Sequence, residues 1–408
     1  MKYLVPSLLI LAGAPVFGAS IADDLVIKPK VQIQMRGQFA ASGTNAAGAD
    51  TSIYNGATGD TEAARFSVRR ARFGAEATNS TGWTGVFQIR AGERADATGN
   101  AGSATRTAEL YYANAAKVFK VEGADIDVHG GLDKPFNRES SISSSTFLLP
   151  MDNPILARIE MRSVGVGAKA LIQDLVRVGF DIQNGNSTVA QDTDSGAPGL
   201  FYSGRIEFAP SKEMMPAKGM ESWAGAPGTH LVVGLDAQSQ NKQITAVGPG
   251  TTVTAGIRND DKTVTTTTVG PDVLFHFDGL SALAAYRMRT AKQENSASTA
   301  PDDIKGSMFS IQAGYAVPLD NGLVLEPALR FSKIDNDKDV DGDANAVFGS
   351  GEYTGSNSGT EFSIGVNAYW NGHKNKTMLA FTSFTGESPA IGDAAKAKVI
   401  TLQHQLTF

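Results

Sequence analysis

The chain has 408 residues, with 36 Lys and Arg against 42 Asp and Glu, which gives a formal net charge of −6. It contains no cysteine, which excludes disulfides and thiolate metal sites. The small negative charge argues against a nucleic-acid binder. A soluble protein of this length usually divides into domains, whereas a large β-barrel need not.

The first 22 residues have the features of a secretory signal peptide. Lys2 precedes an apolar stretch over residues 4–17, and small residues follow it. We expect cleavage after Ala22, with a cut after Gly18 or Ala19 as the alternative. The apolar stretch is short and contains prolines, so it predicts a cleaved signal rather than a membrane anchor.

Apolar and polar residues alternate with a period of two along the rest of the chain. In VQIQMRGQF (31–39) the apolar residues share one face of a predicted strand, while the glutamines and the arginine share the other. About sixteen segments have this pattern, each near the 9–11 residues that cross a bilayer as a tilted strand. The predicted spans are 29–41, 62–78, 81–93, 104–117, 121–134, 160–172, 174–186, 199–210, 228–240, 263–278, 280–294, 303–317, 321–334, 357–371, 374–388 and 394–408.

The connections between these segments alternate between short and long. We expect short turns near residues 79–81, 116–120, 174, 279, 320–321 and 372–373. The 211–227 link falls on the short side but is long. This layout predicts an all-β fold in which residues 23–408 form one closed transmembrane antiparallel barrel of the bacterial outer membrane. The sheet must close because hydrocarbon offers no partner to an unpaired edge. A water-soluble β-sandwich is the alternative.

The last segment, TLQHQLTF (401–408), alternates up to Phe408. In a closed barrel this strand must pair with the first one, and its final aromatic ring suits the interfacial girdle. His404 interrupts the apolar row, and we expect it near a subunit contact or a local bend.

The polar rows are expected to line a water-filled lumen. They carry ten cations and ten anions, so the tally alone does not predict ion selectivity. The cations are Arg36, Arg70, Arg72, Arg90, Lys169, Arg177, Arg205, Arg287, Arg289 and Arg330. The anions are Glu76, Glu109, Asp125, Asp127, Asp133, Asp181, Glu207, Asp236, Glu326 and Glu361.

Arginines gather in RFSVRRARFGAEA (65–77). The alternation turns Arg70 and Arg72 inward and leaves Arg69 toward lipid, which costs about 2–4 kcal/mol at mid-depth. A bulge, a rim position or a subunit interface would relieve that cost. Two interpretations remain open: an arginine track that guides anions, or arginines paired with acids that stiffen the wall.

The 135–159 loop mixes serines with the apolar run FLL (147–149). A solvated outer loop has no use for those apolar groups, so we expect the loop to fold into the lumen and narrow it. The alternative is packing on a neighbouring subunit. An inward loop would bring three cations to the constriction: Lys134, Arg138 and Arg158.

The segment IDNDKDVDGDANAVF (334–348) matches the D-x-D-x-D-G-x-x-N start of a calcium loop. Phe348 stands where the closing glutamate belongs, and no flanking helices are predicted, so a hydrated acidic loop is the alternative. The candidate calcium ligands are Asp337, Asp339, Asp341, Asp343 and Asn345. No other cofactor is expected.

Four motifs resemble the phosphate-selective porin O/P family of bacterial outer membranes. They are SVRRARFGAEA (67–77), VHGGLDKPFNRESS (128–141), RSVGV (162–166) and FDIQNG (180–185), so the likeness covers about residues 30–190. The resemblance implies a sixteen-stranded, usually trimeric barrel that passes phosphate or polyphosphate. It points to Arg69, Arg70, Arg72 and Lys134. The equal inward charges depart from a phosphate filter.

The sequence therefore predicts a porin for passive diffusion of small hydrophilic solutes and ions, with anions such as phosphate preferred. Its partners are outer-membrane lipid, two further copies in a homotrimer and small anionic solutes, without nucleic acid. A non-conducting structural or surface-tethering barrel and a non-selective porin are the alternatives. No nucleophile–base arrangement suggests an enzyme. The predicted pore-lining residues are Arg36, Arg70, Arg72, Arg90, Lys134, Arg138, Arg177, Arg205, Arg287, Arg289 and Arg330.

Overall fold

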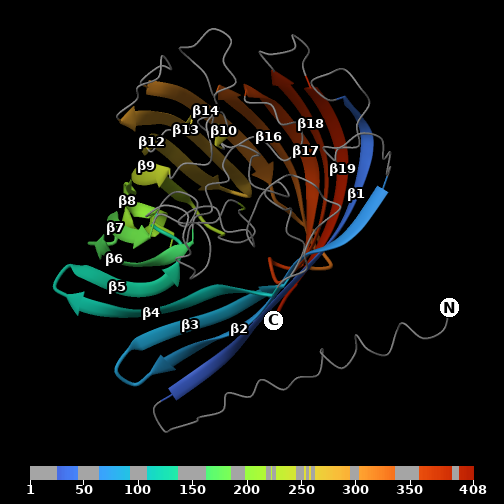
Figure 1. The fold of residues 1–408 in the computed structure, drawn as a ribbon. Helices are drawn as coiled ribbons and strands as arrows, with labels where there is room; N and C mark the ends of the chain where they lie inside the picture. Colours follow the sequence, from blue (N-terminus) through green and yellow to red (C-terminus); the bar gives the residue numbers. More distant parts are fainter. Residues whose placement is uncertain are drawn as a thin grey trace.

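Antiparallel strands make up nearly all of the described chain and curl into a barrel (Figure 1). The structure is a computed structural model. The residues that it describes are 25–44, 64–91, 108–136, 162–184, 198–216, 222, 227–244, 252–253, 257–258, 262–294, 303–335, 358–387 and 395–408.

Sixteen long strands form the wall, as the sequence predicts. They are β1 (Leu25–Thr44), β2 (Ala64–Asn79), β3 (Trp83–Ala91), β4 (Glu109–Val121), β5 (Ala124–Asp133), β6 (Ser163–Ile172), β7 (Val176–Asn184), β8 (Pro198–Phe208), β9 (His230–Ile244), β12 (Lys262–Phe277), β13 (Leu280–Glu294), β14 (Asp303–Tyr315), β16 (Val324–Asp335), β17 (Ser358–Asn371), β18 (Asn375–Glu387) and β19 (Ala395–Thr407). Three two-residue strands accompany them: β10 (Thr252–Val253), β11 (Ile257–Arg258) and β15 (Val317–Pro318).

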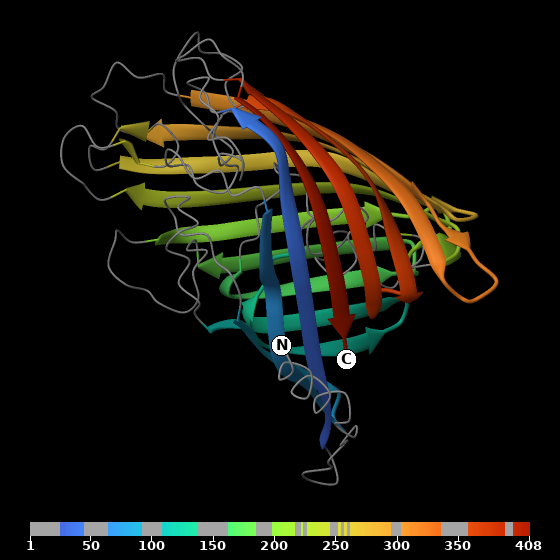
Figure 2. The ribbon, with the colours of Figure 1, turned by 90° about the vertical axis from the view of Figure 1, so that its right-hand side faces the viewer.

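The sheet closes because β1 pairs with β2 on one side and with β19 on the other. Figures 1 and 2 show the blue β1 beside the red β19. The closing seam extends to the final residue, since the Phe408 amide donates to the Val31 carbonyl at 2.9 Å and the Val31 amide donates back at 3.2 Å. The predicted pairing of the last strand with the first is confirmed.

Each strand has one apolar and one polar face. In β16, Leu329 is 48% exposed on the outer face, whereas its neighbour Arg330 is 3% exposed on the inner face. In β1, Met35 is exposed between buried Gln34 and Arg36. The same alternation leaves apolar side chains outside and polar side chains inside along the described strands, which is the layout of a barrel that crosses a membrane.

Short turns join the strands at one end of the barrel. Glycines with positive φ occur in these turns, including Gly82 (φ 82°), Gly279 (φ 84°) and Gly372 (φ 51°), because the turns need a left-handed backbone. The turn expected at residues 116–120 is wrong. β4 continues through that stretch to Val121, and the chain reverses at Gly123 (φ 77°).

The link between β8 and β9 is the long connection at the short-turn end, as the sequence indicates. It includes a 3-10 helix, η2 (Lys212–Met214). Among the described residues there is no helix of the length and apolar character that a membrane span requires.

Candidate functional site

The inner face of the barrel is the candidate site. Nine of the eleven predicted cations lie in its inward rows, Lys134 follows β5 and is half-buried, and Arg138 lies outside the described residues. Whether they bind a solute stays a prediction. The nine are Arg36, Arg70, Arg72, Arg90, Arg177, Arg205, Arg287, Arg289 and Arg330.

Three positive side chains of one wall meet at Tyr111. Tyr111 stands in a β-bulge, because the register between β3 and β4 shifts between Gln88 and Ile89. The bulge turns the ring inward, where it is 2% exposed. The Arg162 guanidinium carbon lies 3.6 Å from the ring centroid, that of Arg72 lies at 4.1 Å and that of Arg90 at 5.6 Å.

Tyr111 is also a hydrogen-bond acceptor for this wall. Its hydroxyl accepts from Nη2 of Arg72 and from Nη2 of Arg162. Each cation–π contact contributes about 0.5–2 kcal/mol, depending on its desolvation. The tyrosine thus holds guanidinium groups together that would otherwise repel one another. We call Arg36, Arg70, Arg72, Arg90 and Arg162 the arginine cluster.

Glutamines orient three members of the arginine cluster. Arg72 Nη1 donates to Gln32 Oε1 at 2.9 Å, and Arg70 Nη1 donates to Gln34 Oε1 at 3.1 Å. Arg36 donates from Nη2 to Oε1 of Gln403 on β19 at 2.7 Å. These are neutral acceptors, so they fix the guanidinium planes without cancelling their charge.

Arg69 stands at a bulge, one of the three solutions that the sequence left open. Gln34 pairs with Arg70 and the next residue, Met35, pairs with Val68, so Arg69 is the extra residue. It is half-buried, while Val68 is 49% exposed on the outer face. The bulge lets consecutive arginines occur without placing Arg69 in the regular lipid-facing row.

Ion pairs hold four arginines of the opposite wall. Arg205 Nη1 and Nη2 form two parallel bonds to Asp272, at 2.7 and 2.9 Å, and Arg205 Nε contacts Glu207 at 2.7 Å. The Arg205 and Asp272 side chains are both 0% exposed. Arg177 contacts the other oxygen of Glu207 at 2.7 Å.

Two further pairs continue along this wall. Arg287 contacts Asp236 at 2.7 Å, and Arg330 Nε contacts Glu361 at 2.9 Å. Their side chains are at most 4% exposed. A carboxylate beside each guanidinium compensates its charge and cross-links neighbouring strands. The second interpretation of the lumen arginines therefore describes this wall well.

The 135–159 loop enters the barrel interior at its first residues. Phe136 is 7% exposed, its amide donates to Asp181 Oδ2 at 2.7 Å, and its carbonyl accepts from Ser203 Oγ at 3.1 Å. His129 Nε2 bonds the other Asp181 oxygen at 2.7 Å. Gly179 leaves room for the ring, because a Cβ there would lie 2.4 Å from Phe136 Cδ1. The rest of the loop, Arg158 included, lies outside the described residues.

The sequence analysis did not predict four of the described inward side chains, which are Tyr111, Arg162, Asp272 and Lys376. Tyr111 depends on a bulge, and Arg162 follows the loop. Asp272 lies beside Pro271 and Leu274, where both faces are partly apolar, and Lys376, 1% exposed, comes directly after a turn. The RSVGV motif was the one signal that could have found Arg162.

The predicted calcium ligands Asp337, Asp339, Asp341, Asp343 and Asn345 lie outside the described residues, as do residues 1–22. Within the part of the chain that the structure describes, no three His, Asp or Glu side chains are placed to hold a metal ion.

His404 lies on the outer face, half-buried. Its Nδ1 pairs with Thr377 Oγ1 at 3.0 Å, and the Trp370 indole donates to the same hydroxyl at 3.2 Å. This small polar group near the short-turn end gives the histidine a local partner on the apolar face.

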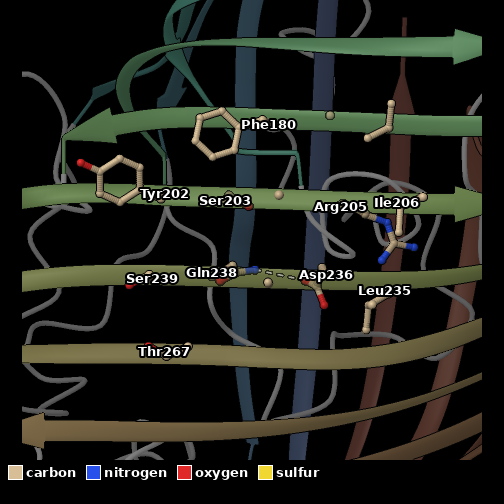
Figure 3. A pocket seen from close by; sticks show the side chains of 14 residues that line it. Phe180, Tyr202, Ser203, Arg205, Ile206, Leu235, Asp236, Gln238, Ser239 and Thr267 are labelled. Carbon is tan, nitrogen blue, oxygen red and sulfur yellow. Dashed lines mark hydrogen bonds between the residues drawn. The ribbon is translucent and has the colours of Figure 1, made fainter.

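An open groove of about 490 Å³ crosses the outer face of β7, β8, β9 and β12 (Figure 3). The exposed side chains of Phe180, Tyr202, Ile206 and Leu235 border it, and the small Gly204 contributes to its lining. Figure 3 also shows Gln238 bonded to Asp236, at 3.2 Å, on β9. The groove belongs to the apolar face, so we do not place a hydrophilic solute in it.

No protein-family model matches the chain, and no curated protein matches it either. Solved structures do. The outer membrane channel DcaP of Acinetobacter baumannii is 12% identical, with 94% of this chain and 97% of that chain covered and a TM-score of 0.54.

An anion-selective porin from Comamonas acidovorans is 10% identical, with 94% and 100% covered and a TM-score of 0.54. OmpT, an outer membrane protein of Vibrio cholerae solved in a trimer form, is 10% identical, with 95% and 100% covered and a TM-score of 0.53. These likenesses extend over nearly the whole chain, and they establish that it has the barrel fold of outer-membrane porins.

Proposed function

We propose that this protein is a porin of the bacterial outer membrane, through which small hydrophilic solutes and ions diffuse passively. The observation that carries the proposal is the closed sixteen-stranded wall with an apolar outer face and a charged inner face. Closure satisfies the backbone groups in hydrocarbon, and the polar rows then surround water. No reaction is needed, because transport follows the concentration gradient.

The arginine cluster supports a preference for anions. Three guanidinium groups gather around Tyr111, and Arg36 of β1 and Arg70 of β2 contact glutamines of the adjacent strands. A wall that gathers charge of one sign raises the local concentration of the opposite ion. The resemblance to the phosphate-selective porin O/P family, and the fold shared with an anion-selective porin, agree with this direction.

Phosphate or a larger polyanion fits the geometry of the cluster. Guanidinium groups present parallel N–H donors that match phosphate oxygens, and the glutamines hold Arg70 and Arg72 in fixed planes. The inward start of the 135–159 loop at Phe136, which contacts β7 and β8, supports a constriction of the lumen. Chloride would pass by the same route with weaker contacts.

A homotrimer is part of the proposal. The comparable barrel OmpT of Vibrio cholerae is described in a trimer form. Cross-linking of the detergent-solubilised protein, followed by separation by mass, would give three copies if the proposal is right. A single band of monomer mass would contradict the trimer and leave the channel proposal intact.

Single-channel recording in planar bilayers tests the proposed function. We expect ohmic conductance, a reversal potential in a salt gradient on the anion side, and a fall in chloride current when millimolar phosphate is added. A barrel that carries no current would contradict the porin and favour the tethering barrel. Current that phosphate leaves unchanged would remove the phosphate preference alone.

A further inference from the structure

The long link between β8 and β9 is the feature that the proposed channel does not yet explain. It lies at the short-turn end, where the other described connections between the long strands are short. Its residues Ala209, Met215 and Ser222 are at most 8% exposed. A link that merely spanned two neighbouring strands at the barrel rim would have no reason to bury them.

Apolar side chains on the inner wall receive the first part of the link. Ala209 and Met215 form a buried cluster with Val232 of β9, Leu274 of β12 and Leu283 of β13. Met214 and Leu171 pack against it. Val232, Leu274 and Leu283 belong to inward rows of their strands. The same rows are polar farther along, at Asp236, Asp272 and Arg287. The rows become apolar where the link packs, so these side chains form an apolar surface for it.

Two polar anchors fix the link farther on. The Pro216 carbonyl accepts from Arg177 Nη2 at 2.8 Å. Ser222 Oγ donates to Glu326 Oε2 at 2.8 Å and lies 3.0 Å from the Tyr369 hydroxyl. Ser222 and Glu326 are both 0% exposed.

Glu326 is built to receive Ser222. Besides Ser222, it accepts hydrogen bonds from Tyr369, from Ser281 Oγ at 3.3 Å and from Asn367 Nδ2 at 3.4 Å. A buried carboxylate needs such donors, since an unmet one carries the full cost of its lost hydration. The serine of the link is therefore part of a complete acceptor site on the wall.

The two anchors stand on well-separated strands of the barrel. Arg177 belongs to β7 and Glu326 to β16, with five long strands between them one way round and nine the other way. Six strand spacings measure at least about 28 Å along the wall. The six residue steps from Pro216 to Ser222 reach about 20 Å. Pro216 and Ser222 must therefore meet their partners from inside the lumen.

We propose that the described part of the β8–β9 link, residues 209–216 and Ser222, forms a second constriction at the short-turn mouth, in series with the one proposed at Phe136. Met215, Pro216 and Ser222 occupy the lumen at this end and restrict the size of solute that passes. This inference rests on the proposed channel function. It adds a filter whose position and chemistry differ from those of the arginine cluster, because apolar and neutral groups build most of it.

Shortening the link tests the proposal. A variant in which residues 210–227 are replaced by Asn-Gly should conduct more than the unchanged protein, because one of two resistances in series is removed. Exposed residues of the same link provide matched controls: Lys212→Ala and Glu213→Gln should leave the conductance unchanged. A shortened variant that folds, conducts and shows the original conductance would overturn the second constriction while leaving the porin in place. If the protein with its original sequence does not conduct, both the second constriction and the porin proposal are overturned.

A measurement on the unaltered lumen covers the case in which the shortened variant does not fold. Since the chain has no cysteine, Lys212→Cys with a thiol label reports which compartment the short-turn end faces. The probe is a neutral polymer that is small enough to enter an unobstructed barrel mouth but too large to pass the link. Added on that side, it should leave the ion current unchanged because the mouth excludes it. A fall in current would show polymer filling an open mouth and would contradict the proposal.

Discussion

At the scale of single residues, the partner of each arginine decides what it can do. Arg205 lies between Asp272 and Glu207, fully buried, and such a pair acts as a cross-link in the wall. Arg72 instead contacts a glutamine and the Tyr111 ring. Sequence alone gives both arginines the same inward position, and it does not predict that their contacts differ in this way.

Removing one partner of the buried pair should destabilise the barrel strongly. Asp272→Ala leaves Arg205 buried beside Glu207 alone, and breaking a pair of this kind costs about 3–5 kcal/mol. Glu76→Gln is the control, because its pair with Lys30 is partly exposed and is expected to contribute about 0–1 kcal/mol. Guanidinium unfolding followed by the fluorescence of the three tryptophans measures both. Equal midpoints for the two variants would contradict the assigned role.

Reversing charge in the arginine cluster should change ion preference. Arg70→Glu with Arg72→Glu replaces two inward cations by anions, so we expect the reversal potential in a salt gradient to move toward cations. Lys333→Glu is the matched control, since Lys333 is exposed on the outer face of β16 and should cause little shift. The cluster has no part in selectivity if the double variant keeps the original reversal potential.

Periodicity placed the inward arginines well, because a strand's alternation fixes the face of every residue once one face is known. It failed at Tyr111, because a bulge breaks the alternation and leaves no mark in the residue types. It failed at Asp272 for a different reason. The neighbouring Leu274 is inward and apolar, since it packs against Met215 of a link that lies far from it in sequence.

At the scale of elements, strand bounds were predicted within a few residues at most places. The turn at 116–120 was wrong because the composition there does not stop a strand, and Gly123, which supplies the positive φ, lies farther on. The paths of the connections were harder to predict. Phe136 turns inward only because Asp181, Ser203 and Gly179 of the wall receive it, and those contacts involve residues far apart in the chain.

The packing of Phe136 against Gly179 gives a prediction at this scale. Gly179→Ala places a Cβ 2.4 Å from the Phe136 ring, so the start of the 135–159 loop must move. We expect a change in single-channel conductance together with greater open-channel noise. Gly204→Ala is the matched control on the next strand, because a Cβ there meets nothing closer than 3.8 Å. If recordings of Gly179→Ala match those of Gly204→Ala, the start of the loop is not part of the constriction.

At the scale of the whole molecule, closure is the condition on which all other features depend. Each of the sixteen long strands has a neighbour on both sides, and the last pairing to complete the ring joins β19 to β1. An open edge in hydrocarbon leaves backbone groups without partners, each at a cost of several kcal/mol. The register of this seam also sets which residues of β1 face inward, and Arg36 lies opposite Gln403 because of it.

Shortening the last strand should therefore prevent folding rather than merely weaken the barrel. Deleting residues 405–408 removes the partners of Gln32, Ile33 and Gln34 and the two hydrogen bonds between Phe408 and Val31. We expect no folded barrel, measured as loss of the fast-migrating, heat-sensitive form in electrophoresis after refolding into detergent. Phe408→Leu keeps the backbone bonds and changes only the ring, so that variant should still fold.

Folding of the deletion variant to the same extent would mean that the seam does not need its final residues. Failure of Phe408→Leu would instead assign the requirement to the aromatic side chain, which is 61% exposed on the outer face.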